Sequence, residues 1–180
     1  MNKQIQVQRK QLGMTLMEVL ASLAIIATVV VGSLSLFGAA NSSSTASQLQ
    51  KDLIALRTAT QTQYTGQGSY GAVSTSLNPI LVKSRKVPTS LNTTSSNTIT
   101  TSLNGTVAVS VHDTNVNQFT ITVTAVPDDV CASLVTSMSS GWASVQVGSA
   151  TARTTFPVSP TDATTDCTGN NNSIVWTTQS

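Results

Sequence analysis

The sequence predicts an α+β protein, in which a long N-terminal spine helix packs on an antiparallel-sheet head that also holds a small helix and one disulfide. Three observations predict this fold class. An uncharged apolar run, Val19–Ala40, continues into a segment whose apolar residues recur with helical spacing. Segments rich in β-branched residues, separated by Gly and Asn, fill much of the second half. The two cysteines, Cys131 and Cys167, both lie in the C-terminal third.

The chain begins with a basic segment, residues 1–13, which contains Lys3, Arg9 and Lys10, no acidic residue, and Gly13 at its end. An ordinary secretory signal is cleaved after its apolar core, at small residues. Here the glycine precedes the apolar run. Cleavage at Gly13 would therefore remove the basic leader and leave the apolar helix on the mature protein.

Glu18 is the only ionised side chain between Gly13 and Lys51. A lone carboxylate at the start of a membrane-length apolar helix is costly unless it has a specific partner. The alternative is a residue at headgroup level that extends into water.

The predicted spine helix covers residues 14–63, of which 14–40 form a membrane or filament core and 41–63 pack on the head. Val19–Ala40 exceeds the roughly 20 residues needed to span a bilayer. The basic leader marks the N-terminal side as cytoplasmic, which leaves everything after Ala40 outside. The apolar stripe of the second half consists of Ala46, Leu49, Leu53, Leu56 and Thr60. The opposite face carries Lys51, Asp52 and Arg57.

The head, residues 64–180, begins with a long connection that reaches about Ser96. Asn104-Gly105 is a strong hairpin signal between two strands. Pro127-Asp128-Asp129 indicates the start of a short helix that ends at Gly141. The predicted strands are Asn97–Leu103, Thr106–His112, Gln118–Val126, Trp142–Val147, Thr151–Phe156 and Ser173–Thr177. The aromatic residues Phe119, Trp142 and Trp176 are expected in the core.

The cysteines are expected to form one disulfide, because exported domains favour disulfides and the chain holds one pair. A metal site is disfavoured, because neither Cys131 nor Cys167 has a second Cys or His nearby in the sequence. Closing this loop would stabilise the head by on the order of 4 kcal/mol in the chain-entropy model.

Charge and motifs argue against several functions. Without the leader, six basic residues face seven acidic ones, so the mature chain lacks the basic character of a nucleic-acid-binding protein. The cluster Lys83, Arg85 and Lys86 is expected in a solvated loop. His112 is the sole histidine, and no nucleophile motif or phosphate-binding loop accompanies it. We therefore expect no enzyme, no cofactor and no metal, and we interpret Asp128-Asp129 as helix-start acids rather than cation ligands.

Gly13, Met14, Thr15 and Glu18 fit the motif of the type IV prepilin family, which this segment resembles. That motif is Gly, then a hydrophobic residue or Met, then Thr, with Glu four positions after the first mature residue. The resemblance implies cleavage after Gly13 and N-methylation of Met14 by a prepilin peptidase. It also implies that Glu18 neutralises the Met14 amine of a neighbouring subunit and thereby sets the register of a filament.

Within this family the chain resembles the type IVb branch, and in particular the major prepilins of conjugative thin pili and related enterobacterial pili. Ser35 stands where many pilin helices have Pro, and Met14 at the mature N-terminus and the long leader favour the same branch. The resemblance implies an inner-membrane prepilin that becomes an extracellular pilus for adhesion, aggregation or conjugative contact. The implied partners are other copies of the chain, the assembly platform and its ATPase, the outer-membrane secretin and minor pilins.

Three alternatives remain. A type II secretion pseudopilin shares the N-terminal motif, and a minor pilin also shares the overall layout. An uncleaved, membrane-anchored periplasmic binding domain belongs to another class, in which Gly13 and Glu18 have no role in assembly.

Overall fold

The computed structural model describes residues 15–138 and 141–179, and for residues 34–39 it describes the backbone only. The basic leader, Gly13 and Met14 therefore lie outside the described residues. A long helix, α1, covers Leu16–Gln63. The chain divides into two compact units, Met1–Ala40 and Asn41–Ser180.

In the N-terminal unit, three hydroxyl side chains of α1 donate hydrogen bonds within the helix. The Ser22 hydroxyl donates to the Glu18 carbonyl at 2.8 Å, and the Thr28 and Ser33 hydroxyls donate to carbonyls one turn earlier. These side chains therefore place no unpaired donor on an apolar helix surface.

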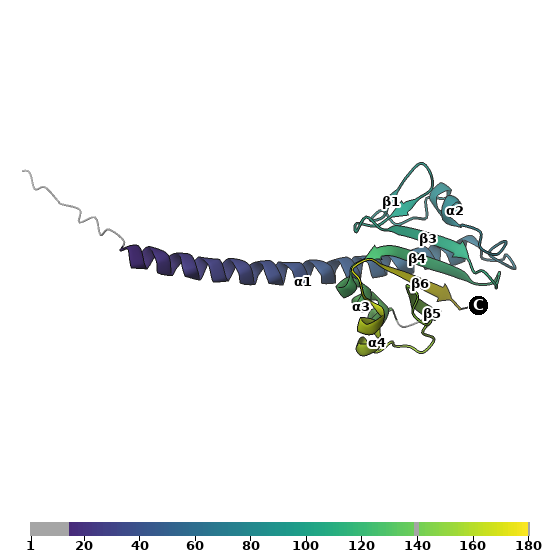
Figure 1. The fold of residues 1–180 in the computed structure, drawn as a ribbon. Coiled ribbons are helices and arrows are strands. Elements are labelled where there is room, and N and C mark those ends of the chain that lie inside the picture. The colour runs from purple at the N-terminus through teal and green to yellow at the C-terminus, as the bar shows by residue number, and fades with distance from the viewer. Residues whose placement is uncertain (1–14, 139–140, 180) are drawn as a thin grey trace, which may run out of the picture. The chain divides into compact units, whose positions relative to one another are not determined.

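The head contains a six-stranded antiparallel sheet among the described residues, with the order β1-β2-β3-β4-β6-β5 (Figure 1). The strands are β1 (Asn92–Thr93), β2 (Ile99–Thr100), β3 (Thr106–Val111), β4 (Phe119–Val126), β5 (Trp142–Val147) and β6 (Asn172–Thr178). The last strand, β6, lies between β4 and the edge strand β5, so the C-terminal segment is hydrogen-bonded on both sides within the sheet.

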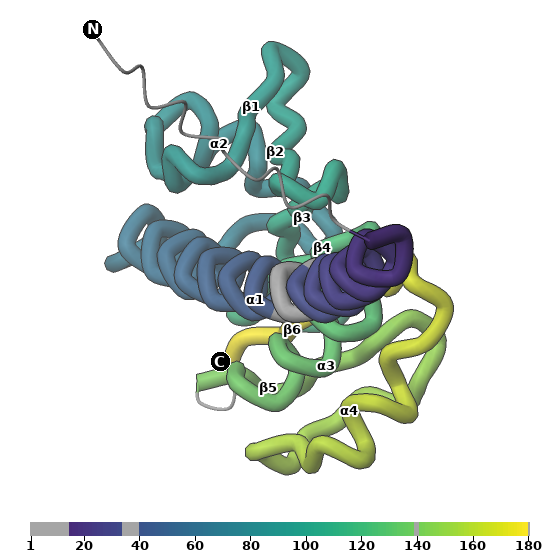
Figure 2. The backbone as a smooth tube through the Cα atoms, turned by 90° about the vertical axis from the view of Figure 1, so that its left-hand side faces the viewer, coloured from purple at the N-terminus to yellow at the C-terminus, as the bar shows by residue number. Residues whose placement is uncertain are grey.

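Three short helices accompany the sheet: α2 (Asn78–Lys83), α3 (Asp128–Ser137) and α4 (Pro160–Asp166). Helix α2 contacts β3, whereas α3 contacts β6 and α4. Both Figure 1 and Figure 2 show α2 on one side of the head and α4 on the other. Helices α2 and α3 thus pack beside different strands of the sheet.

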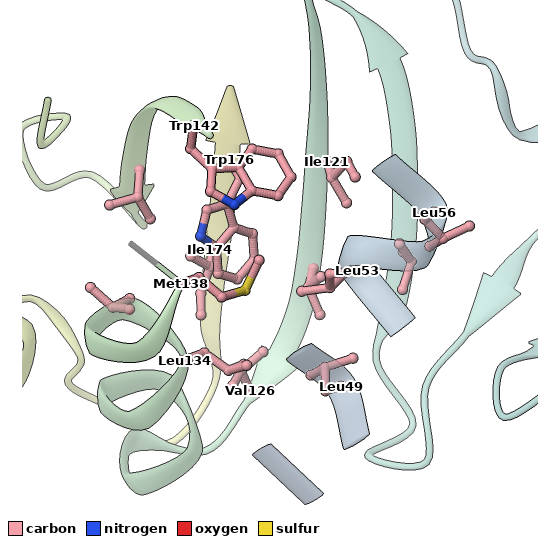
Figure 3. Close-up of a cluster of buried hydrophobic side chains, with 14 of the residues drawn as sticks. Leu49, Leu53, Leu56, Ile121, Val126, Leu134, Met138, Trp142, Ile174 and Trp176 are labelled. Carbon is pink, nitrogen blue, oxygen red and sulfur yellow. The ribbon is translucent and has the colours of Figure 1, made fainter. Parts of the chain in front are cut away.

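The part of α1 that belongs to the head packs on the sheet through the predicted stripe. Leu53 and Leu56 are fully buried, and Figure 3 shows them in one cluster with Ile121 and other core side chains. Ala46, Leu49 and Thr60 are buried as well. The predicted core positions Phe119, Trp142 and Trp176 are also confirmed.

Two of the charged residues on the opposite face of this helix contact the head. Asp52 is only 5% exposed, and its Oδ1 accepts hydrogen bonds from Ser90 Oγ at 2.5 Å and Gln48 Nε2 at 3.0 Å. The Arg57 guanidinium lies 5.0 Å from the centre of the Trp142 ring, in a cation–π contact. Asp52 lies on the face opposite the stripe, as predicted, and is nevertheless buried because the connection after α1 folds back over it.

The hairpin at Asn104-Gly105 has a longer loop than predicted. Ile99 pairs with Val107 and Thr100 with Thr106, which leaves Thr101–Gly105 as a five-residue connection. Asn104 has φ +59°, and a Cβ on Gly105 would collide with the Thr124 carbonyl. Gly105 is thus required by the close approach of β4.

Several element predictions were wrong. Thr151–Phe156 forms no strand, and its Arg153 makes only an isolated bridge to Val145. The strand expected over Asn97–Leu103 contracts to β2, and the long connection holds α2 and β1, neither of which was predicted. Helix α4 was also missed.

Cys131 and Cys167 are joined in a disulfide with their Cα atoms 5.9 Å apart. Cys131 lies in α3 and Cys167 directly follows α4, and both are buried. The disulfide therefore links α3 covalently to the end of α4, and both helices are short.

Candidate functional site

The structure describes one of the three predicted residues at the N-terminal site. Glu18 lies in the first turn of α1 with an exposed side chain, whereas Gly13 and Met14 are outside the described residues. The proposed pairing of Glu18 with a Met14 amine thus stays a prediction.

Thr15 is the first described residue. It directly precedes α1 and caps the helix. The Glu18 amide donates to the Thr15 carbonyl at 3.0 Å and lies 3.4 Å from Thr15 Oγ1, and the Val19 amide donates to the same carbonyl at 3.2 Å. The pattern Thr15-x-x-Glu18 is that of a capping box. An acidic residue in the first turn also interacts favourably with the positive end of the helix dipole. The sequence carried this signal, but our sequence interpretation did not use it.

The side chains that follow Glu18 form an apolar surface. Leu16–Ser33 is long and apolar enough to cross a membrane, and none of it is buried in the structure. Leu16 is 78% exposed and Val31 70%. Apolar surface of this extent marks a membrane or protein contact. The other large apolar side chains that are exposed along it are Met17, Val19, Leu20, Leu23, Ile25, Ile26, Val29 and Val30.

In the head, ion pairs and hydrogen bonds join α4, which precedes Cys167 of the disulfide, to Arg153. Arg153 donates two hydrogen bonds to Asp166, at 2.8 and 3.0 Å, and its Nη1 lies 3.2 Å from Asp162 Oδ1. The hydrogen bond to Asp166 raises the pKa of Arg153, so its guanidinium stays charged. This arrangement ties α4 to the segment that precedes it.

Asp128 connects α3 to the turn before β6 instead of capping its own helix. Its Oδ1 accepts from Asn172 Nδ2 at 2.7 Å and from the Asn170 amide at 2.8 Å. The hydrogen bond from Asn172, together with the one from Asn170, lowers the pKa of the Asp128 carboxyl. Asp129 accepts only from the adjacent Val130 amide among the described residues. The interpretation of both acids as helix-start residues was thus incomplete for Asp128.

The described residues contain no group of three or more His, Cys, Asp or Glu side chains that could hold a metal ion. His112 lies near Asp113, with 3.0 Å between Nδ1 and Oδ1, and also contacts Thr114.

Comparison with known proteins gives matches to both the N-terminal helix and the head. Residues 8–34 match the prokaryotic N-terminal methylation motif. The crystal structure of TcpA, a type IV pilin from the Vibrio cholerae El Tor biotype, superimposes with a TM-score of 0.55 at 15% identity, over 76% of this chain and 99% of that one. No curated protein matches the chain significantly.

The apolar helix with its methylation motif and the sheet head with one disulfide give this chain the fold of a type IV pilin. Residues 43–179, well over half of the chain, match the family model described as PilS N terminal. The chain therefore belongs to the PilS family, whose members are structural proteins rather than enzymes.

Proposed function

We propose that this protein is the major, repeated subunit of a type IVb pilus. The observation that carries the proposal is the exposed apolar helix Leu16–Ser33 with Glu18 as its lone charge, directly after the Gly13-Met14-Thr15 motif. Cleavage after Gly13 leaves an amine at the tip of this helix, which the peptidase methylates on Met14.

Glu18 then sets the register between neighbouring subunits. When apolar helices bundle, the Met14 amine and the Glu18 carboxylate both leave water, and an unpaired buried charge is destabilising by several kcal/mol. Pairing Glu18 of one subunit with Met14 of the next compensates both charges at one axial position. Most of the association free energy comes from apolar contacts along the helix.

The sequence features that support the type IVb branch are Met14 and the absence of Pro at Ser35. The protein is inserted in the inner membrane with the leader in the cytoplasm and the head in the periplasm. Prepilin peptidase, an assembly platform with its ATPase, a secretin and minor pilins then act on it. The extracellular fibre serves adhesion, aggregation or conjugative contact, and residues 131–167 contribute to its surface.

The test is the intact mass and N-terminal sequence of the protein in filaments sheared from cells. We expect a chain that begins at methylated Met14, is two hydrogens lighter than the reduced form, and dominates the fibre. A processed chain that is scarce in the fibre would indicate a minor pilin. A processed chain found only with a secretion system would indicate a pseudopilin. A chain that retains Met1 and is found only in the membrane would indicate an anchored binding domain instead of a pilin.

A further inference from the structure

Two adjoining cavities lie where the chain leaves α1. Their volumes are about 310 and 400 Å³, at the lower end of the range of roughly 300–1,000 Å³ that is usual for ligand sites. Tyr64, Gln67 and Tyr70 line both cavities, and Asn117, from the turn between β3 and β4, lines the smaller one. We call these four residues the tyrosine site. Two segments that are distant in the sequence thus meet in one hollow of the head.

The backbone and the rings of the tyrosine site are held in place by contacts within the head. The Tyr70 amide donates to the Val116 carbonyl at 2.9 Å, and the Gln67 amide donates to the Tyr64 carbonyl at 3.0 Å. The Tyr70 ring makes edge-to-face contacts with Tyr64 and with the buried Phe119, at 5.3 and 4.8 Å between ring centres. Because the site is formed without a ligand, little ordering entropy is lost when one binds.

The polar ends of these four side chains are free to bind a ligand. Within residues 15–138 and 141–179, the hydroxyls of Tyr64 and Tyr70 and the side-chain amides of Gln67 and Asn117 form no hydrogen bond. Burial raises the pKa of Tyr64 and of Tyr70, so both hydroxyls stay protonated at neutral pH. Each amide and each hydroxyl can both donate and accept. The site therefore offers several neutral hydrogen-bonding groups next to aromatic rings.

The chemistry of the lining favours an uncharged ligand. None of the described residues that line the two cavities is charged, and Leu77 and Ile80 add an apolar wall to the larger one. The charge of Arg57 acts on Tyr70, but this guanidinium lies against the Trp142 ring and lines neither cavity. A charged ligand would thus lose its water without gaining a counter-charge in the lining.

A sugar ring has the matching chemistry, because its hydroxyls donate and accept and its C–H face packs on an aromatic ring. We infer that the tyrosine site binds a neutral sugar residue of a glycan. Tyr64 is the stacking ring, since it contacts one other aromatic ring whereas Tyr70 contacts two. Gln67 and Asn117 bond to the sugar hydroxyls. The binding itself requires only the head, whereas its use in attaching a fibre to a glycan-covered surface rests on the proposed function.

Saturation-transfer difference NMR on the full chain, in a detergent without a sugar headgroup, tests this inference. The probes are the methyl glycosides of glucose, galactose and mannose and the corresponding uronides, which have the same rings with a carboxylate added. We expect a neutral glycoside to bind, with the strongest saturation on the C–H protons of one ring face. Its uronide should bind about tenfold or more weakly, because the carboxylate finds no counter-charge.

Gln67→Ala with Asn117→Ala should weaken binding of the neutral glycoside about tenfold or more, because its hydroxyls lose their partners. Tyr64→Ala should remove the preference of the saturation for one ring face. The matched control is Gln61→Ala with Asn171→Ala, which removes the same two exposed side-chain types outside the tyrosine site and should leave binding unchanged. Disulfide formation and urea unfolding verify that each variant folds.

Three results would overturn the inference: no binding of any neutral glycoside to the wild type, undiminished binding in the folded Gln67 and Asn117 variant, or a preference for the uronide. Each of them would leave the filament role standing, because the mass and N-terminal sequence of the protein in sheared filaments test that role separately.

Discussion

At the scale of single residues, the position of Glu18 combines a capping role within the helix with the pairing role proposed above. As the third residue of α1 it completes a Thr15-x-x-Glu18 capping pattern, and as the lone charge on an apolar helix it is available to a neighbouring amine. The first role acts within one chain and the second between chains. They can be separated because glutamine retains the capping function but not the charge.

We predict that Glu18→Gln lowers the yield of sheared filaments by about tenfold or more, since the Met14 amine would be buried without a counter-charge. Insertion and leader cleavage should persist, which immunoblots of the membrane fraction would show. Thr15→Val is the matched control that removes the capping hydroxyl and retains the carboxylate. If, with cleavage intact, it reduced the yield as much as Glu18→Gln, capping rather than charge pairing would explain the role of Glu18.

The carboxyl group of Asp128 makes the stability of the head depend on pH at the acidic end of the range. Its pKa in the folded protein lies below its ordinary value of 3.8, so its contribution to stability is present above that value and is lost as the pH falls through the folded pKa. We predict that Asp128→Asn is less stable than the wild type at neutral pH, and that the difference shrinks below about pH 4. Urea unfolding at several pH values measures this. Asp129→Asn is the matched control, because Asp129 accepts only from the adjacent Val130 amide among the described residues. An equal effect of both substitutions would contradict the prediction.

At the scale of secondary-structure elements, the second half of α1 supplies the head with its central apolar stripe. Leu53 is fully buried against the sheet, whereas the next residue, Ile54, is 46% exposed. The stripe recurs at three- and four-residue spacing, so one helix face enters the core while the other meets solvent and the connection. The core of the head therefore includes the second half of α1, whereas the first half of this helix belongs to the N-terminal unit.

We predict that Leu53→Ala destabilises the head by about 2–5 kcal/mol, because it leaves a cavity in a packed core. Ile54→Ala should change the free energy of unfolding by less than about 1 kcal/mol, as its side chain is half exposed. Urea unfolding of the full chain in detergent, followed by tryptophan fluorescence of Trp142 and Trp176, reports on this core. Equal effects of the two substitutions would show that the stripe is not packed as described.

At the scale of the whole molecule, the protein has a low fraction of charged residues, 9%, and uses Ser, Thr and Asn for its polar surface. Such a surface repels its own copies weakly, which suits dense packing of identical subunits. Its stability is supplemented by a covalent link, because Cys131 and Cys167 close a loop across 36 positions that contains α4 and β5.

We predict that Cys131→Ser with Cys167→Ser lowers the free energy of unfolding by about 4 kcal/mol, since the unfolded chain regains the entropy of an open loop. The wild type measured with a reducing agent should unfold at the same urea concentration as this variant. A reduced wild type as stable as the oxidised protein would indicate that contacts around α3 and α4 suffice without the link.

The sequence by itself determined the features that depend on local periodicity. The apolar run, the stripe over residues 46–60 and the strands β3, β4, β5 and β6 each repeat a pattern over several residues, and the structure has them close to their predicted bounds. The N-terminal motif is equally local, because its residues are consecutive or one helical turn apart. For this reason the resemblance to the type IV prepilin family could be drawn from the first 18 residues.

Only the tertiary structure decided the features that depend on distant partners. Asp52 is buried because Ser90, 38 positions later, covers it, and Asp128 acts through Asn172 rather than on its own helix. Helices α2 and α4 are six and seven residues long, too short to show a helical period, and Thr151–Phe156 has strand composition but only one bridging residue. Local pattern specifies what a segment can form, whereas burial and hydrogen bonding depend on which distant segments fold against it.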